Sequence, residues 1–221
     1  MKLGIMQPYL FPYIGYFQLI SAVDIWVVFD DVQYIRHGWV NRNRILSPNI
    51  QKEWQYITVP IQKFKREDFI EDIKINNTVA WQNSILGKLS YYKQIKAPFY
   101  STVQSLVKEM LEKKYDSIVE LNIRTIQSVC DYLGVEFNYR ISSKEKYDYS
   151  HVSGAGDWAL EISKQMAVKQ YINPIGGIEL FDKSKFENEN IEIKFLKSKL
   201  PIYKQGGREL VPDLSILDVM M

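Results

Sequence analysis

Residues 2–31, "KLGIMQPYLFPYIGYFQLISAVDIWVVFDD", decide the fold. The short apolar run at Lys2–Met6 is typical of a buried strand, and the near-helical spacing of apolar residues over Gly15–Val23 indicates a helix. A β-branched and aromatic run follows and stops at Asp30 and Asp31. Strand, turn, helix and strand in this order predict a right-handed crossover and therefore a parallel sheet.

The rest of the chain continues this α/β pattern. Residues 79–134 have long helical periodicity, with a joint at Pro98 and a stop at Gly134. We expect one domain over residues 1–221, with a mostly parallel sheet, flanking helices and a helical insertion at 79–134. The further strands are expected at 53–61, 135–142, 170–177 and 191–198, and a shorter helix at 156–168.

Composition excludes several classes of protein. A chain of 221 residues with 46% hydrophobic and 24% charged residues suits one soluble globular domain. Its 28 basic and 26 acidic residues argue against a duplex nucleic-acid binder. Gln7, Pro8 and Pro12 interrupt the first apolar run, so neither a signal peptide nor a membrane span is expected. These features predict a cytoplasmic protein without an integral membrane segment.

The cysteine and histidine content argues against a metal centre. Cys130 is the single cysteine, and its apolar surroundings predict a buried structural thiol. The two histidines, His37 and His151, are far apart in sequence. A closed zinc site is therefore not expected, and no metal ligand is assigned.

The turn after the first strand is rich in proline and aromatic residues. Between Met6 and Ile20 there are two prolines, three tyrosines and two phenylalanines. The prolines stiffen the turn, and ligands of parallel sheets bind beyond the carboxyl ends of the strands. We interpret the turn as a preorganised pocket wall; the alternative is that its aromatic residues only cap the core. The residues expected to bind substrate are Gln7, Tyr9, Tyr13 and Tyr16.

A dense polar cluster, "DDVQYIRHGWVNRNRI", covers residues 30–45. Alternation along an extended segment places its asparagines on one face and its last two arginines on the other. Guanidinium pairs suit phosphate or carboxylate, amides suit sugar hydroxyls or a base edge, and aromatic rings can stack on either. The alternative is a charged hairpin whose arginines pair with the aspartates. The residues expected to bind substrate are Gln33, Tyr34, Trp39, Asn41, Arg42, Asn43 and Arg44.

A third cluster, "SHVSGAGDW" at 150–158, is a small-residue loop that enters a helix. Backbone N–H groups at such a point can hold an anion, so residues 154–156 are a candidate phosphate loop. His151 could act as a general base near neutral pH; the alternative is an ordinary exposed histidine. Turns at 173–177 and 204–207 could rim the same cleft. The candidate catalytic residues of the chain are Asp30, Asp31 and His151.

These motifs resemble the WbqC-like family of bacterial proteins over nearly the whole chain. The resemblance rests on "MQPYLFPYIGYFQLI", "FDDVQYIRHGWVNRNRI", "YINPIGGIELFD" and "PDLSILDVM". The family occurs among genes for surface polysaccharides such as lipopolysaccharide O-antigens, so the resemblance implies a pathway more than a reaction. It points to Gln7, Pro8, Tyr9, Pro12, Tyr13, Gly15, Tyr16, Asp30, Asp31, Gln33, Tyr34, Trp39, Asn41, Arg42, Asn43 and Arg44.

A second resemblance concerns the fold. "YIGYF" after the first strand is placed like the H-x-G-H turn of nucleotidylyl-transferring Rossmann-like enzymes. Tyr13 and Tyr16 stand where the two histidines would donate to phosphate. The resemblance implies a Rossmann-like sheet of the nucleotidyltransferase or HUP type, with neutral tyrosines in place of the histidines.

The leading functional hypothesis is a transferase that modifies a nucleotide-activated amino sugar, by acyl or aminoacyl transfer to the sugar amine. The motifs offer no obvious covalent nucleophile, which favours direct transfer. One alternative is a non-catalytic binding or scaffold protein of the same pathway. Another is nucleotidyl transfer or ligation with ATP and magnesium, with Asp30 and Asp31 as metal ligands. The sequence identifies no cofactor, and it leaves homo-oligomer formation open.

Overall fold

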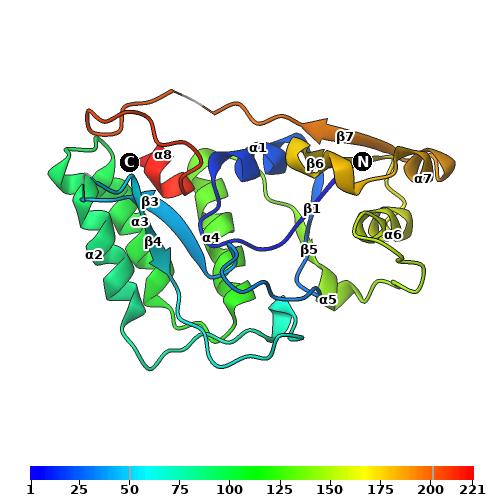
Figure 1. Ribbon diagram of the computed structural model, residues 1–221, viewed down its shortest axis with the longest axis horizontal. Helices are drawn as coiled ribbons and strands as arrows, with labels where there is room; N and C mark the ends of the chain where they lie inside the picture. The colour runs from blue at the N-terminus through cyan, green and yellow to red at the C-terminus, as the bar shows by residue number, and fades with distance from the viewer. Residues whose placement is uncertain (50, 201) are drawn as a thin grey trace.

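The first strand forms where the sequence predicts it and lies at the centre of a five-stranded sheet. The computed structural model describes residues 1–49, 51–200 and 202–221. The strand order is β5-β2-β1-β6-β7, and the four pairings are all parallel. The fold is therefore mixed α/β (Figure 1). The strands are β1 (Lys2–Met6), β2 (Ile25–Val28), β5 (Tyr139–Ile141), β6 (Gln170–Pro174) and β7 (Glu192–Leu196).

The strand order places a topological switch point beside β1. The chain moves outward from β1 to β2 and β5, then returns to the other side of β1 with β6 and β7. At such a point neighbouring crossovers leave the first strand in opposite directions, which opens a crevice beyond the carboxyl ends of the strands. The sequence after β1 and after β6 therefore borders the natural ligand position of this sheet.

Alternating side chains of the sheet feed two hydrophobic cores. Ile25 and Val27 of β2 face one core together with residues of α6 and α7, whereas Trp26 and Val28 face the other. This is the period of two expected of a strand that is buried on both faces. Cys130 lies fully buried in the larger core, and burial raises the pKa of its thiol to about 12, which confirms the predicted structural thiol.

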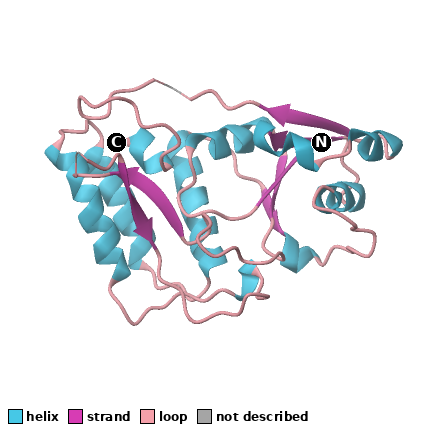
Figure 2. Cartoon of the chain, viewed as in Figure 1, coloured by secondary structure: helices cyan, strands magenta, loops and turns pink. Residues whose placement is uncertain are grey.

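Helices and a separate hairpin make a second lobe beside the sheet. In Figure 1 the hairpin β3 (Arg42–Leu46) and β4 (Trp54–Thr58) lies against α2, α3, α4 and α8, and Figure 2 shows its strands apart from those of the sheet. The larger core continues from α1 into this lobe. The helices are α1 (Ile14–Ala22), η1 (Ile70–Asp72), α2 (Trp81–Gln94), α3 (Tyr100–Glu112), α4 (Ile118–Leu133), α5 (Ser142–Glu145), α6 (Asp157–Gln165), η2 (Ile175–Leu180), α7 (Lys183–Asn188) and α8 (Ile216–Met220).

The predicted helical segment contains three helices rather than two. α2 ends before Pro98 as expected, but the following helical run is broken between Glu112 and Ile118, where Ser117 caps α4. The strand expected at 135–142 is shorter than predicted. Within the described ranges, none of the helices has the length and non-polar character needed to cross a membrane.

The turn at residues 7–12 is fixed by donors from distant parts of the chain. Its prolines supply no N–H groups, and its buried carbonyls still need partners. Tyr16 Oη donates to the Gln7 carbonyl at 3.0 Å. Asn43 Nδ2 donates to the carbonyls of Leu10 and Phe11 at 2.9 and 2.8 Å, and Ser215 Oγ also donates to Phe11 at 2.8 Å.

Asn122 of α4 joins this turn to the segment before β3. Its side chain is completely buried, and Nδ2 lies 2.9 Å from the Pro8 carbonyl and 2.7 Å from the Val40 carbonyl. One amide therefore holds together two segments that are far apart in sequence. Because Pro8 and Val40 are both buried, their carbonyls depend on this donor.

We expect Asn122→Ala to lower the free energy of unfolding by about 2–4 kcal/mol, because it removes two hydrogen bonds and leaves two buried acceptors unpaired. Urea denaturation measures the difference. Gln127→Ala is the matched control on the same helix, since its amide bonds only to the exposed Asp131, and it should change stability by less than about 0.5 kcal/mol. A similar small loss for Asn122→Ala would show that water replaces the amide.

Candidate functional site

A small pocket lies at the switch point of the sheet. This strand-end pocket has a volume of about 190 Å³, and its wall includes Gln7 and Tyr9 after β1, Phe29 after β2, Trp158 of α6 and Asn173 of β6. Met6 pairs with Val28 in register, so the segments after β1 and β2 leave the same edge of the sheet. The structure thus confirms that Gln7 and Asp30 lie at one edge.

The two aspartates after β2 are held by the segment after β5. Ser143 donates to Asp30 from its backbone N at 3.0 Å and from its hydroxyl at 2.9 Å, and Asp30 is only 2% exposed. Ser142 Oγ lies between the two carboxylates, 3.0 Å from Asp30 Oδ1 and 2.5 Å from Asp31 Oδ1. Asp30 is therefore enclosed, whereas Asp31 remains half-buried.

An aromatic side chain connects Asp31 to the strand-end pocket. Tyr149 Oη donates to Asp31 Oδ2 at 2.7 Å, and the Tyr149 ring centre lies 4.5 Å from that of Trp158. Burial and the hydrogen bond to Asp31 raise the pKa of Tyr149 far above its ordinary value. Tyr149 therefore remains a neutral donor, and it fixes the orientation of the Asp31 carboxylate beside the pocket wall.

A second pocket adjoins the first through Tyr9. This aromatic pocket has a volume of about 360 Å³. Tyr9 lines both pockets, so their walls share this residue. Burial raises the pKa of Tyr9, which keeps its hydroxyl neutral. The pocket is lined by Tyr9, Pro12, Tyr13, Trp39, Asn43, Arg44 and Asp213.

The arginines of β3 stack on aromatic rings along one face of the hairpin. The Arg42 guanidinium lies 4.2 Å from the Tyr56 ring centre. The Arg44 guanidinium lies 5.2 Å from Trp39 and 5.3 Å from Trp54. Arg44 Nε is buried and has no hydrogen-bond partner among the described residues. Cation–π contacts of this kind hold a guanidinium in place. Arg42 also donates to the His37 and Gly38 carbonyls, and Arg44 Nη2 donates to the Asp213 carbonyl at 3.2 Å.

The largest cavity lies at the other end of this hairpin face. This basic cavity has a volume of about 1020 Å³ and lies between residues 33–37 and 61–66. Of the predicted substrate-binding residues, it brings together Gln33, Tyr34, Asn41 and Arg42. Tyr34 and Asn41 bond to each other at 2.8 Å, and Asn41 Nδ2 donates to the Val59 carbonyl at 2.9 Å, so both also hold the wall together.

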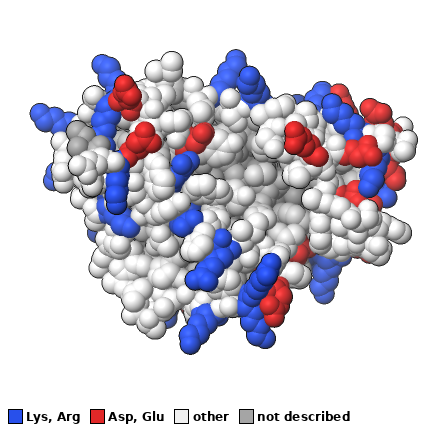
Figure 3. All heavy atoms as spheres, viewed as in Figure 1, with Lys and Arg blue, Asp and Glu red and all other residues white. Residues whose placement is uncertain are grey.

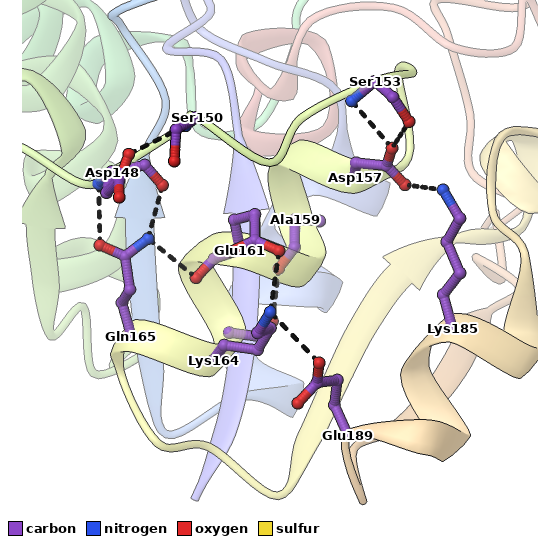
Figure 4. A network of polar contacts seen from close by, with 11 residues as sticks. Asp148, Ser150, Ser153, Asp157, Ala159, Glu161, Lys164, Gln165, Lys185 and Glu189 are labelled. Atoms are coloured by element: carbon purple, nitrogen blue, oxygen red, sulfur yellow. Dashed lines mark hydrogen bonds and ion pairs between the residues drawn. The ribbon is translucent and has the colours of Figure 1, made fainter.

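The glycine loop before α6 carries an internal anion. Figure 4 shows the Asp157 carboxylate directed at Ser153 and Lys185. Asp157 Oδ2 accepts from the backbone N–H groups of Ser153 and Gly154 at 3.0 Å each, and Oδ1 pairs with Lys185 at 2.7 Å. Of the N–H groups proposed for a phosphate, that of Gly154 is thus occupied by the chain itself, as is the neighbouring N–H of Ser153.

The sequence pattern of the WbqC-like protein family matches residues 7–221. The chain belongs to this family. It is also 30% identical to "Uncharacterized protein Rv1507c" of Mycobacterium tuberculosis over 223 residues, which cover 99% of this chain and 92% of the relative. No solved structure matches the chain significantly.

Four of the residues predicted to act in the site, Asp30, Asp31, Tyr16 and His151, lie outside the walls of these pockets. Tyr16 is 2% exposed, and its hydroxyl donates a hydrogen bond to the Gln7 carbonyl. His151 is exposed in the loop between α5 and α6, outside the pocket walls. Their functional roles stay predictions, and the geometry gives Tyr16 a structural one. In the described ranges, no group of three or more His, Cys, Asp or Glu side chains is placed to hold a metal ion.

Several residues of the WbqC-like site were missed by the sequence interpretation. Ser142 and Ser143 begin the segment that holds the aspartates, and their position directly after a predicted strand could have revealed them. Trp158 and Asn173 belonged to motifs that were noted but not assigned to the pocket. The aromatic partners of the arginines on β4 follow only from the strand register.

We expect Asp157→Asn to destabilise the protein at neutral pH and to have less effect in acid. The Lys185 bond, followed by Ser153, holds the pKa of Asp157 well below its ordinary value. A depressed folded-state pKa stabilises above the unfolded-state pKa, about 3.9, and this stability is lost as the pH falls through the folded-state pKa. Urea denaturation at several pH values should show the difference from wild type shrinking below about pH 4.

Asp131→Asn, an exposed substitution on α4, controls for the general effect of removing a carboxylate. A difference between wild type and Asp157→Asn that stays constant across pH would mean that the ionised carboxylate does not contribute.

Proposed function

We propose that the chain is a transferase that modifies a nucleotide-activated amino sugar, by acyl or aminoacyl transfer to the sugar amine. The observation that carries the proposal is that Tyr9 lines two pockets. One is bordered by Trp158, which packs on the Asp31 partner Tyr149, and the other is an aromatic pocket that contains an arginine. Aromatic rings suit the flat faces of a sugar or base, and a guanidinium suits phosphate. A ligand that carries both features matches this cleft.

The proposed fold assignment is Rossmann-like, of the nucleotidyltransferase or HUP type. The five strands of the sheet can be numbered 1 to 5 by their order in the chain, leaving out the hairpin strands. Their order across the sheet is then 3-2-1-4-5, which agrees with the beginning of the doubly wound order. The strand-end pocket lies at the switch point where such folds bind nucleotides. These features support the assignment.

Asp31 is the favoured base among the three candidates. A sugar amine attacks the acyl carbon, a C–N bond forms, the bond to the leaving group breaks, and the amine loses a proton. Asp31 is half-buried and oriented by Tyr149, whose ring packs on Trp158 of the pocket wall, so it suits that proton. Asp30 is enclosed by Ser142 and Ser143 and suits a positioning role.

The pathway part of the proposal rests on the family. The WbqC-like resemblance implies a place in bacterial surface-polysaccharide biosynthesis, where amino sugars are modified as nucleotide-activated precursors. The ATP-dependent alternative would use Asp30 and Asp31 as magnesium ligands. The engagement of both Asp30 oxygens by serines favours the transferase over this alternative.

The first test is binding of UDP-glucosamine, which carries a free amine, measured by isothermal titration calorimetry. Trp39→Ala should weaken binding about tenfold or more, because it removes a ring that lines the aromatic pocket and stacks on Arg44. Tyr132→Ala removes a similarly exposed aromatic ring from α4 and should leave binding unchanged.

Three outcomes separate the hypotheses. Binding of ATP with magnesium, but of no nucleotide sugar, would favour the ATP-dependent enzyme. Binding of neither would favour a scaffold protein. If UDP-glucosamine binds, mass spectrometry with acyl and aminoacyl donors tests catalysis, and amide formation should be lost in Asp31→Asn.

The two tyrosines of the opening turn should respond differently to loss of the hydroxyl. Tyr16→Phe leaves the buried Gln7 carbonyl without its donor and should lower the free energy of unfolding by about 1–3 kcal/mol. Tyr13 lines the aromatic pocket, and its hydroxyl makes no hydrogen bond with the described residues. Tyr13→Phe should therefore keep stability and weaken UDP-glucosamine binding about tenfold or more.

Urea denaturation and calorimetry measure the two effects on the same samples. Wild-type affinity in Tyr13→Phe would remove its hydroxyl from the binding site, and wild-type stability in Tyr16→Phe would contradict its structural role.

A further inference from the structure

The turn that usually holds phosphate in doubly wound folds is filled by the chain's own atoms. In such folds the pyrophosphate lies on the N–H groups between the first strand and helix. Here Pro8 and Pro12 lack N–H groups, and the start of α1 is covered. A Cβ added to Gly15 would lie 2.4 Å from Ser198 Oγ and 2.4 Å from a Tyr13 ring carbon. Ser198 and Tyr13 therefore crowd the start of α1 beside Gly15.

The second anion position is occupied as well. The N–H groups of Ser153 and Gly154 point at the Asp157 carboxylate, and Lys185 neutralises that carboxylate (Figure 4). A phosphate would have to displace a carboxylate that is already paired and hydrogen-bonded. A phosphate-bearing ligand therefore needs its partners elsewhere.

Positive charge is concentrated in the basic cavity. Its wall contains Arg36, Arg42, Lys63 and Arg66 and, within the described residues, no Asp or Glu. Figure 3 shows Lys and Arg side chains gathered over the loops that join β4 to η1. The ion pairs in the described parts of the chain involve other cations. The cations of this wall thus form no ion pair among the described residues.

The wall is also ordered before any ligand binds. Arg42 donates to the carbonyls of His37 and Gly38 while it stacks on Tyr56. Gln33 Nε2 donates to the Arg66 carbonyl at 2.6 Å, which joins the two loops. A wall that is already ordered loses less conformational entropy on binding an anion.

We propose that the basic cavity binds a group of two or more adjacent phosphates, the diphosphate of the nucleotide-activated ligand. The inference rests on the proposed function only for the identity of the rest of that ligand. Several cations converge on a space larger than one phosphate needs, which favours a diphosphate over a single anion.

Two neighbouring arginines of the hairpin link the proposed diphosphate site to the aromatic pocket. Arg42 and Arg44 are two residues apart on the same face of β3, about 7 Å along the strand. Arg42 lines the basic cavity, and Arg44 lines the aromatic pocket. A ligand with its diphosphate beside Arg42 can therefore place its ring beside Trp39 and continue toward Tyr9.

The test uses inorganic pyrophosphate alone, measured by isothermal titration calorimetry at low salt. The double variant Arg36→Ala/Arg66→Ala removes two exposed cations from the cavity. We expect it to weaken pyrophosphate binding at least about tenfold. The control Arg124→Ala/Arg140→Ala removes the same charge from exposed positions outside the cavity and should bind like wild type.

Orthophosphate and salt provide the second readout. Wild type should bind pyrophosphate at least about tenfold more tightly than orthophosphate, and added salt should weaken both. Equal affinity of the two double variants, or no pyrophosphate binding by wild type, overturns the inference. If pyrophosphate binding depends on Arg36 and Arg66 while UDP-glucosamine does not bind, the diphosphate site is confirmed and the proposed function is contradicted.

Discussion

The structure depends on how the proline-containing turn after β1 satisfies its buried carbonyls. Two prolines deprive this turn of donors, so it cannot complete its own hydrogen bonds. Asn43, Asn122 and Ser215 supply donors from β3, α4 and the start of α8. Phe11 is held there at φ 41°, a conformation that is costly for a non-glycine residue and that persists only when its surroundings enforce it. The parallel sheet, the hairpin and the helical lobe thus meet at one turn, whose outward side carries Tyr9 and Tyr13.

The need to satisfy the buried carbonyls of this turn also explains the alternation along β3 between residues that hold the turn and residues that line the pockets. Asn43 points inward to the turn, while Arg42 and Arg44 point outward to Tyr56, Trp39 and Trp54. A strand that lies between a buried polar network and an open cleft must use one face for each. A polar stretch can therefore contain residues that matter for the cleft without any contact with a ligand.

The sequence predicted most of the sheet because its strands are short apolar runs that stop at turns. The shared edge of β1 and β2 followed directly, since the two strands are parallel neighbours. The role of Asn43 could not be predicted from the sequence. An asparagine whose buried amide donates to carbonyls has the same sequence pattern as one whose exposed amide binds a sugar. The role of Asp157 was hidden for a related reason: a glycine loop looks the same whether a phosphate or the chain's own carboxylate fills it. The separation of the expected helical run into α3 and α4 depended on a serine cap inside an otherwise regular pattern.

Acidic side chains gather at the sheet edge and basic side chains gather on the hairpin. At the sheet edge the carboxylates accumulate: burial, followed by the charges of Asp30, Asp72 and Asp31, raises the pKa of Glu71. On the hairpin the cations of the basic cavity accumulate around Arg42. Gln33, which lines the basic cavity, follows Asp31 by two residues. The acidic and the basic region are therefore separated by about 7 Å along the chain. An elongated molecule with an anionic end and an amine end would be aligned by the charges of these two regions before any specific contact forms. Its phosphates would face the hairpin and its amine the carboxylates. The proposed transferase reaction requires this orientation, since it brings the amine to Asp31.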